Sequence, residues 1–113
     1  MKTIYLAGPY SSNNQEGIRY NIAEARHVSS ILWQHGYAVL TPHLNSANFE
    51  EFDISWQIFM DGYLTFLPLC DIVVMLPRWQ DSKGASIEND TAKALGKRII
   101  YWDYNALDLL SKI

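Results

Sequence analysis

The feature that most constrains the fold is an uninterrupted apolar run, Ile72-Val73-Val74-Met75-Leu76, which ends at Pro77. Consecutive apolar residues rich in β-branched side chains are typical of a strand that is buried on both faces of a parallel sheet. Parallel strands need long crossover connections, which helices usually supply. The run therefore predicts an α/β protein with helices on both sides of a parallel sheet.

The rest of the chain alternates between short apolar segments and segments of helical period. We predict strands at residues 4–7, 37–41, 71–76 and 98–102, and helices at about 15–35, 54–67, 82–95 and 107–113. Residues 45–53 show no clear period and are predicted to form a loop. This order indicates a Rossmann-like or flavodoxin-like three-layer sandwich with four or five parallel strands, in one domain that spans residues 1–113.

Composition excludes several classes of function. The formal charge of −3, from 9 Lys and Arg against 12 Asp and Glu, provides no basic surface for polymeric nucleic acid. The single cysteine, Cys70, cannot form an intramolecular disulfide, which favours a reducing cytoplasmic location. No stretch approaches the roughly 18 apolar residues of a membrane span, and the first eight residues lack the apolar region of a signal peptide. We expect a cytoplasmic protein that binds neither polymeric nucleic acid nor a membrane.

Motifs for cofactors and metals are missing from the sequence. It contains neither the GxGxxG dinucleotide pattern nor the GxxxxGK[ST] phosphate loop. His27, His35 and His43 are eight positions apart, unlike the spacing of common metal sites. We therefore expect no cofactor and no metal. His43 follows the second strand and is a candidate for ligand contact, although an ordinary loop histidine is the simpler interpretation.

Three loops follow the strands at the edge where α/β proteins bind ligands, at residues 8–17, 42–53 and 77–84. In the first loop, Gly8, Ser11 and Ser12 are candidates for a polar wall. In the third, the Trp79 indole has two roles open to it, stacking on a planar base or packing on the surface. Asp71 begins its strand at the opposite edge, so it is predicted to bind backbone amides instead.

Glu88 is the most informative single residue, because it lies on the same helical face as Ala85, Ala92 and Leu95. A carboxylate on an apolar face near the amino end of a helix is expected to stay ionised, since the helix dipole favours negative charge there. A poorly hydrated carboxylate in a crevice is a good nucleophile or base. The simpler alternatives are an ion pair with Arg or Lys and a solvated acid.

The start of the same helix carries groups that suit an anion. Ser82, Gly84 and Ser86 offer hydroxyls and accessible backbone amides, and Lys83 adds a positive charge. Whichever serine caps the helix needs no further role.

Three segments of the chain resemble a known family. Residues 3–11 (TIYLAGPYS), 70–79 (CDIVVMLPRW) and 82–88 (SKGASIE) are similar to the nucleoside 2-deoxyribosyltransferase-like superfamily, including its small phage and bacterial members. The resemblance implies that Glu88 attacks the anomeric carbon of a nucleoside or nucleotide and that Tyr5 orients this glutamate. The family's carboxylate that assists departure of the base corresponds to Tyr63 in this chain.

The resemblance also bears on the substrate. Ser82 matches a position where nucleoside 5′-monophosphate N-glycosidases carry serine and nucleoside-transferring members carry aspartate, and an aspartate would repel a phosphate. Ser11, Ser12 and Arg19 are then candidates for further phosphate contacts. The implied function is cleavage of the N-glycosidic bond of a nucleoside or deoxynucleoside 5′-monophosphate through a glycosyl–Glu88 intermediate, or base exchange, in a homodimer or larger homo-oligomer. A non-catalytic nucleotide-binding domain is the alternative.

Overall fold

The sheet is built from four parallel strands. The computed structural model describes residues 1–103, so the predicted helix at residues 107–113 lies outside the described part. The strands are β1 (Thr3–Ala7), β2 (Ala38–Leu40), β3 (Ile72–Met75) and β4 (Arg98–Tyr101), in the spatial order β2-β1-β3-β4. The predicted α/β class and parallel sheet are therefore confirmed, and β3 is a central strand, as its continuous apolar run indicated.

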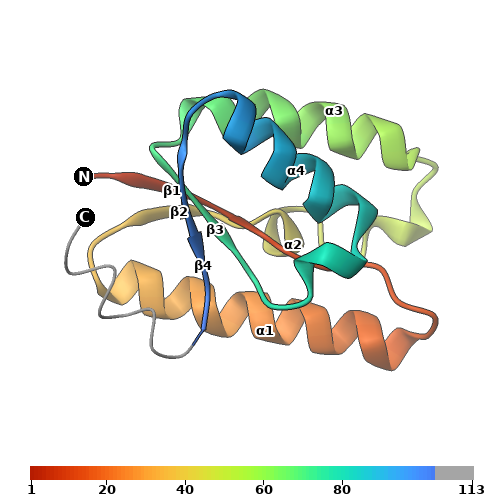
Figure 1. Ribbon diagram of the computed structural model, residues 1–113. Coiled ribbons are helices and arrows are strands. Elements are labelled where there is room, and N and C mark those ends of the chain that lie inside the picture. Colours follow the sequence, from red (N-terminus) through yellow and green to blue (C-terminus); the bar gives the residue numbers. More distant parts are fainter. Residues whose placement is uncertain (104–113) are drawn as a thin grey trace.

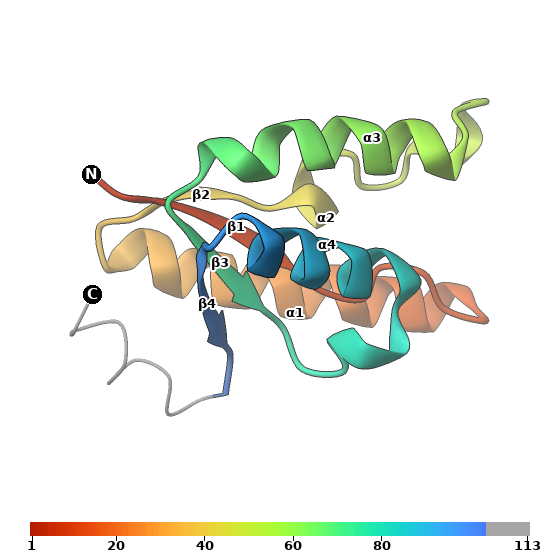
Figure 2. The ribbon, with the colours of Figure 1, turned by 45° about the horizontal axis from the view of Figure 1, so that its top comes forward.

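Helices cover both faces of this sheet (Figure 1). α1 (Gln15–Gln34) lies on one face, and α3 (Trp56–Phe66) and α4 (Lys83–Ala94) lie together on the other, as the turned view also shows (Figure 2). In the part of the chain that the structure describes, no helix is both long enough and apolar enough to cross a membrane.

Short helical turns connect the longer elements. The prediction that residues 45–53 form a loop is only partly confirmed, because that segment includes the last residue of a short helix and a 3₁₀ turn in its middle. α2 (Pro42–Asn45) begins at a proline, whose fixed φ suits the first turn of a helix, and Phe49–Glu51 form a 3₁₀ turn. Turns this short have no hydrophobic period to detect. Further 3₁₀ turns lie at Leu67–Leu69 and Trp79–Asp81.

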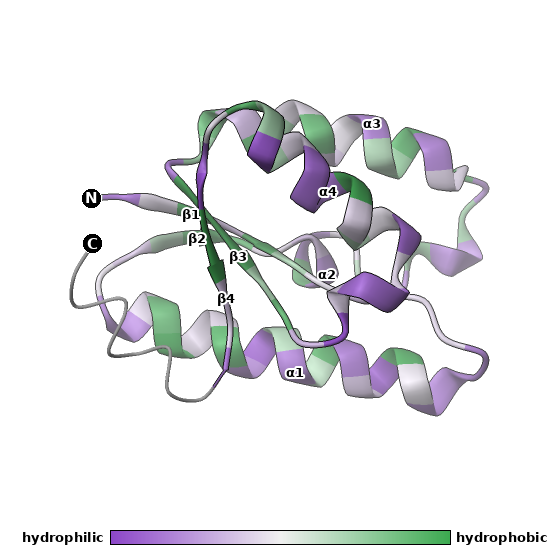
Figure 3. Ribbon diagram, viewed as in Figure 1, coloured by the Kyte–Doolittle hydropathy of each residue, from purple (hydrophilic) through white to green (hydrophobic). Residues whose placement is uncertain are grey.

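The alternation of side chains along β1 supplies both faces of the core. Ile4 and Leu6 pack on the α1 side, whereas Tyr5 and Ala7 pack on the side of α3 and α4. Figure 3 shows β3 coloured as hydrophobic along its length, while the helices alternate between hydrophobic and hydrophilic residues. The strand is hydrophobic throughout because both of its faces are buried, and the helices alternate because only one of their faces is buried.

The buried face of α1 differs from its predicted apolar stripe at the amino-terminal end. Ala25, Val28 and Leu32 are buried as expected, but Asn21 is buried where Ile18 and Ile22 are only partly covered. Asn21 is buried because its side-chain amide bridges two loops at the site described next.

Candidate functional site

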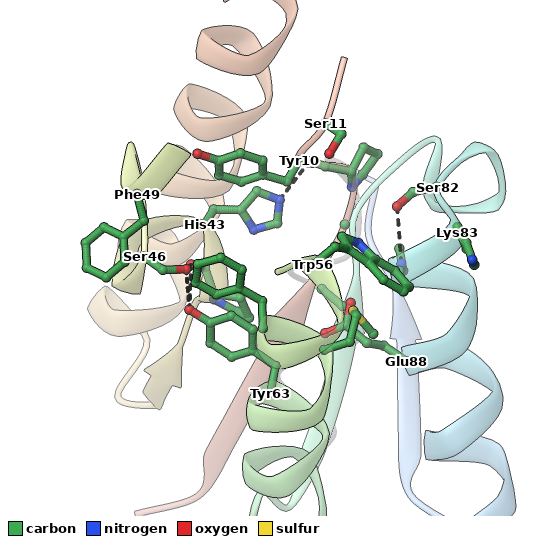
Figure 4. A pocket seen from close by; sticks show the side chains of 18 of the residues that line it. Tyr10, Ser11, His43, Ser46, Phe49, Trp56, Tyr63, Ser82, Lys83 and Glu88 are labelled. Carbon is green, nitrogen blue, oxygen red and sulfur yellow. Dashed lines mark hydrogen bonds between the residues drawn. The ribbon is translucent and has the colours of Figure 1, made fainter. Parts of the chain in front are cut away.

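A cavity of about 620 Å³ opens at the carboxyl ends of β1 and β3 (Figure 4). Its walls come from the loop after β1, from the segment between β2 and α3, and from the loop between β3 and α4. These are the three loops that the sequence placed at this edge. The cavity is lined by six of the candidate site residues, Gly8, Ser11, His43, Ser82, Gly84 and Glu88, and also by Tyr63 and Lys83.

The buried side of the cavity carries a tyrosine–carboxylate pair. Tyr5 is fully buried on β1, and its hydroxyl donates a hydrogen bond to Glu88 Oε2 on α4. Tyr5 does not itself line the cavity, so it lies behind Glu88 as seen from the opening. Because strand alternation directs Tyr5 toward α4, two residues 83 positions apart in the chain meet within the core.

Burial controls the charge of Glu88. Its side chain is only 7% exposed, and desolvation raises its pKa from 4.5 to about 7, although the hydrogen bond from Tyr5 acts in the opposite direction. The sequence predicted an ionised carboxylate here; burial instead raises the pKa, so that Glu88 gains or loses its proton near neutral pH. Within residues 1–103, no lysine or arginine forms an ion pair with Glu88.

Tyr5 stays protonated throughout the ordinary pH range. Desolvation, followed by the charge of Glu88, raises the pKa of Tyr5 well above its usual value. The tyrosine is therefore a fixed donor that faces an acceptor titrating near neutral pH. A carboxylate held in this way can act as a nucleophile or as a base.

One end of the cavity is formed by the amino end of α4. Ser82 caps this helix, and its Oγ accepts a hydrogen bond from Ala85 N at 3.2 Å, which leaves the hydroxyl proton free to donate to a ligand. The Lys83 ammonium lies 4.8 Å from the centre of the Trp56 ring. Asp81 lines the same end. At Gly84, an added Cβ would lie 3.2 Å from Met60 Sδ, so the glycine allows α3 and α4 to approach closely.

Two loops of the cavity are joined by Asn21, which the sequence analysis did not identify. Its Nδ2 donates to the Tyr10 carbonyl at 2.9 Å, and its Oδ1 accepts from Arg78 Nη2 at 2.9 Å. Arg78 also lines the cavity. The sequence does contain a sign of this role. Asn21 lies three residues after Ile18 and four before Ala25, so an amide side chain falls within the apolar stripe of the helix.

The other end of the cavity is aromatic. Tyr10 lies beside His43, with ring centres 6.0 Å apart. The Tyr63 hydroxyl lies 2.5 Å from Ser46 Oγ, and Trp56 stands between the two ends (Figure 4). Phe49, Phe52 and Phe59 also line this wall. These residues were not singled out as aromatic lining, because short turns and a helix of mixed period carry them.

Besides Tyr5, four candidate site residues from the sequence lie outside the cavity lining. Ser12 packs against Gly17, where an added Cβ would meet its Oγ at 1.9 Å, and Arg19 lines a separate shallow depression along α1. Trp79 stacks on Tyr101 with ring centres 5.6 Å apart, and the Ser86 hydroxyl donates to the Trp79 carbonyl at 3.4 Å. Within residues 1–103, no three His, Cys, Asp or Glu side chains are grouped to hold a metal ion.

Asp71 lies at the opposite edge of the sheet, as predicted. Its Oδ2 accepts from Thr3 N at 2.9 Å and from Thr3 Oγ1 at 3.1 Å, which ties the start of β1 to the start of β3. This carboxylate has a structural role.

Comparisons with known proteins agree with this architecture. A family model described as "Domain of unknown function (DUF4406)" matches residues 2–101. The chain is similar to the solved structure of a 2-deoxyribosyltransferase from the bacterium Bacillus psychrosaccharolyticus, with 25% identity and a TM-score of 0.60 over 86% of this chain and 69% of that one.

A second solved structure, a 2-deoxyribosyltransferase from Leishmania mexicana, is 23% identical, with a TM-score of 0.60 over 90% of this chain and 64% of that one. No curated protein matches the chain. The fold is therefore the one found in these 2-deoxyribosyltransferases, and this chain spans about two thirds of their length.

Proposed function

We propose, on the premise that this chain belongs to the DUF4406 family, that it cleaves the N-glycosidic bond of a nucleoside or deoxynucleoside 5′-monophosphate. The observation that carries the proposal is the buried Glu88, held by Tyr5 at the inner wall of a cavity large enough for a nucleotide. The likeness to 2-deoxyribosyltransferases supports glycosyl transfer as the class of chemistry.

The reaction follows from the position of Glu88. The ionised carboxylate attacks the anomeric carbon while the bond to the base breaks, and the base departs with that electron pair and takes up a proton from water. The resulting glycosyl ester is hydrolysed by water, as in retaining glycosidases. Attack by a second base in place of water would exchange the base. Tyr5 orients the attacking carboxylate and stabilises its charge through the hydrogen bond.

Three features support a 5′-monophosphate. The Ser82 hydroxyl proton is free to donate, the Lys83 ammonium adds positive charge, and Ser11 faces the cavity from the loop after β1. With the phosphate at the amino end of α4, the anomeric carbon reaches Glu88 and the base extends toward the aromatic end.

The outer side of α3 supports self-association. Ile58 and Phe66 on α3, and Leu69 on the 3₁₀ turn that follows it, are exposed. No atom lies near the position of a Cβ on Gly62, so a second helix could approach closely. We propose that the chain forms a homo-oligomer through this face. Sedimentation should show that Ile58→Glu lowers the mass of the assembly, whereas an unchanged mass would contradict this interface.

The test of the reaction is chromatography of free base after incubation with a panel of ribo- and deoxyribonucleoside 5′-monophosphates. We expect the native protein to release one or more bases and Glu88→Gln to release none. Binding by calorimetry without release of any base would instead favour a non-catalytic nucleotide-binding domain.

The phosphate end is tested by two substitutions that keep the helix cap. Asp and Asn both cap helices well, so Ser82→Asp and Ser82→Asn differ mainly in charge. We expect Ser82→Asp to weaken binding of a monophosphate at least about 10-fold more than binding of the matching nucleoside, because the carboxylate repels the phosphate. Equal losses for the two ligands, or equal effects of Asp and Asn, would contradict a phosphate at this end.

A further inference from the structure

His43 holds an unpaired polar atom in the wall of the cavity. The side chain is 3% exposed, and its Nε2 lies 2.8 Å from the Pro9 carbonyl oxygen. Its other ring nitrogen, Nδ1, is buried and has no hydrogen-bond partner. A buried polar atom without a partner costs about 1–3 kcal/mol, so folded proteins retain few of them.

The contact with Pro9 fixes the chemical character of Nδ1. A carbonyl oxygen can only accept, so Nε2 must carry the proton and donate it. Burial lowers the pKa of His43, which keeps the ring neutral near pH 7. Nδ1 therefore has no proton and can only accept a hydrogen bond.

The location of His43 decides which part of a nucleotide it meets. Figure 4 shows the ring on the side of Tyr10, Ser46 and Tyr63, across the cavity from Ser82 and Lys83. The neighbouring hydroxyls are already engaged, since Tyr63 contacts Ser46 Oγ and Tyr10 donates to Glu50. Among these groups, His43 Nδ1 is the acceptor without a bond.

We propose that His43 Nδ1 accepts a hydrogen bond from an N–H group at the edge of the base, and so selects bases that present a donor there. This inference rests on the proposed function for the identity of the ligand as a nucleotide. Because Nδ1 is covered, the base reaches it by displacing the side chains that screen the ring. Pairing then removes the cost of the unsatisfied nitrogen, which makes the preference for an N–H favourable.

The experiment compares pairs of ligands in which one member has an amino group or ring N–H that the other lacks. Four pairs of deoxynucleoside 5′-monophosphates are used, with the bases adenine and purine, cytosine and 2-pyrimidinone, guanine and hypoxanthine, and uracil and 3-methyluracil. Binding is measured by calorimetry in proteins that also carry Glu88→Gln, so that the ligands stay intact. We expect the N–H member of at least one pair to bind about 10-fold more tightly, the value of one neutral hydrogen bond.

Two substitutions of His43 separate its two ring nitrogens. The shorter amide in His43→Asn places Oδ1 close to the position of Nδ1, whereas the longer amide in His43→Gln reaches the position of Nε2 and can keep the bond to Pro9. We therefore expect His43→Asn to retain the N–H preference and His43→Gln to lose it. The preference is a ratio within each variant, so a change in stability alone does not alter it. His35→Phe, at the exposed end of α1, is the control and should leave the ratio unchanged.

The outcomes distinguish this inference from the proposed reaction. Equal binding within all four pairs, or a preference that survives in His43→Gln, overturns the role of Nδ1. If the protein with native Glu88 releases base but shows no N–H preference, the proposed reaction is supported and the role of His43 is contradicted. An N–H preference without base release supports the role of His43 and contradicts the proposed reaction. Failure of all eight ligands to bind contradicts both the role of His43 and the proposed reaction.

Discussion

The two faces of the sheet are built from the same strands but contain different chemistry. On the α1 face, the side chains of β1 and β3 pack almost entirely against aliphatic groups. On the face covered by α3 and α4, Tyr5 meets Glu88, and the cavity opens beside them. Adjacent residues of β1 therefore serve different purposes, since Leu6 contributes to stability and Tyr5 to the site.

The largest effect should follow from Glu88→Gln on the cavity face. We expect base release to fall by about 10³-fold or more, because an amide cannot act as the nucleophile. Stability should be kept or increased, since the amide carries no charge to bury and still accepts from Tyr5. Rates and urea unfolding are the measurements. Asp90→Asn, an exposed acid on the same helix, is the matched control, and an equal loss of activity there would contradict the role of Glu88.

On the opposite face, Leu6→Ala should affect stability and leave the chemistry unchanged. Leu6 is fully buried against α1, so the cavity left by the substitution should lower the free energy of unfolding by about 3 kcal/mol. Urea denaturation measures this loss. Activity per folded molecule should remain near the native value, and a large fall in that activity would show that the two faces are not independent.

The pH dependence should distinguish Glu88 from the rest of the core. The folded protein keeps the Glu88 proton up to a pKa of about 7, whereas an unfolded carboxyl loses it near 4.5. The resulting stability is fully present below pH 4.5 and is lost as the pH rises through 7, by up to about 3 kcal/mol. Unfolding of Glu88→Gln measured between pH 4 and 8 should lack this fall, and parallel curves for the two proteins would contradict the raised pKa.

Activity should follow the opposite trend with pH, because the nucleophile must be ionised. The smallest of the expected effects belongs to Tyr5→Phe, which removes the hydrogen bond that lowers the pKa of Glu88. The acid limb of the rate profile should move to higher pH, with a loss of about 10-fold at pH 7. Tyr20→Phe, on the exposed surface of α1, should leave the profile in place. A reduced rate without any shift of the profile would assign Tyr5 a packing role only.

The sequence predicted those parts of the fold that have a clear hydrophobic period. Continuous apolar residues identified β3, and the glycines that end α1 and α4 adopt positive φ, as helix ends favour. Glu88 could be singled out because a carboxylate interrupts an apolar face. Leu95, assigned to that face, is instead exposed at the end of α4, where the helix no longer covers the sheet.

Contacts between distant segments could not be predicted from periodicity. Two examples are the hydrogen bond from His43 Nε2 to the Pro9 carbonyl and the bridge from Asn21 to Arg78. Both depend on how the loops close over the sheet. Trp79 was correctly placed after β3, but the 3₁₀ turn there directs its ring onto Tyr101. Loop positions can be read from strand order, whereas side-chain directions within loops require the tertiary structure.

The register of the central strands has a consequence for how such a site can change over generations. Tyr5 pairs with Val73 and Leu40 on either side of β1, so its hydroxyl is positioned by three strands and by no loop. The aromatic wall between residues 42 and 56 is built mostly of short turns, and the aromatic side chains on these turns are partly exposed. Under the proposed function, substitutions in this wall should change which base is accepted while Tyr5 and Glu88 keep their geometry, and libraries confined to residues 42–56 test this expectation.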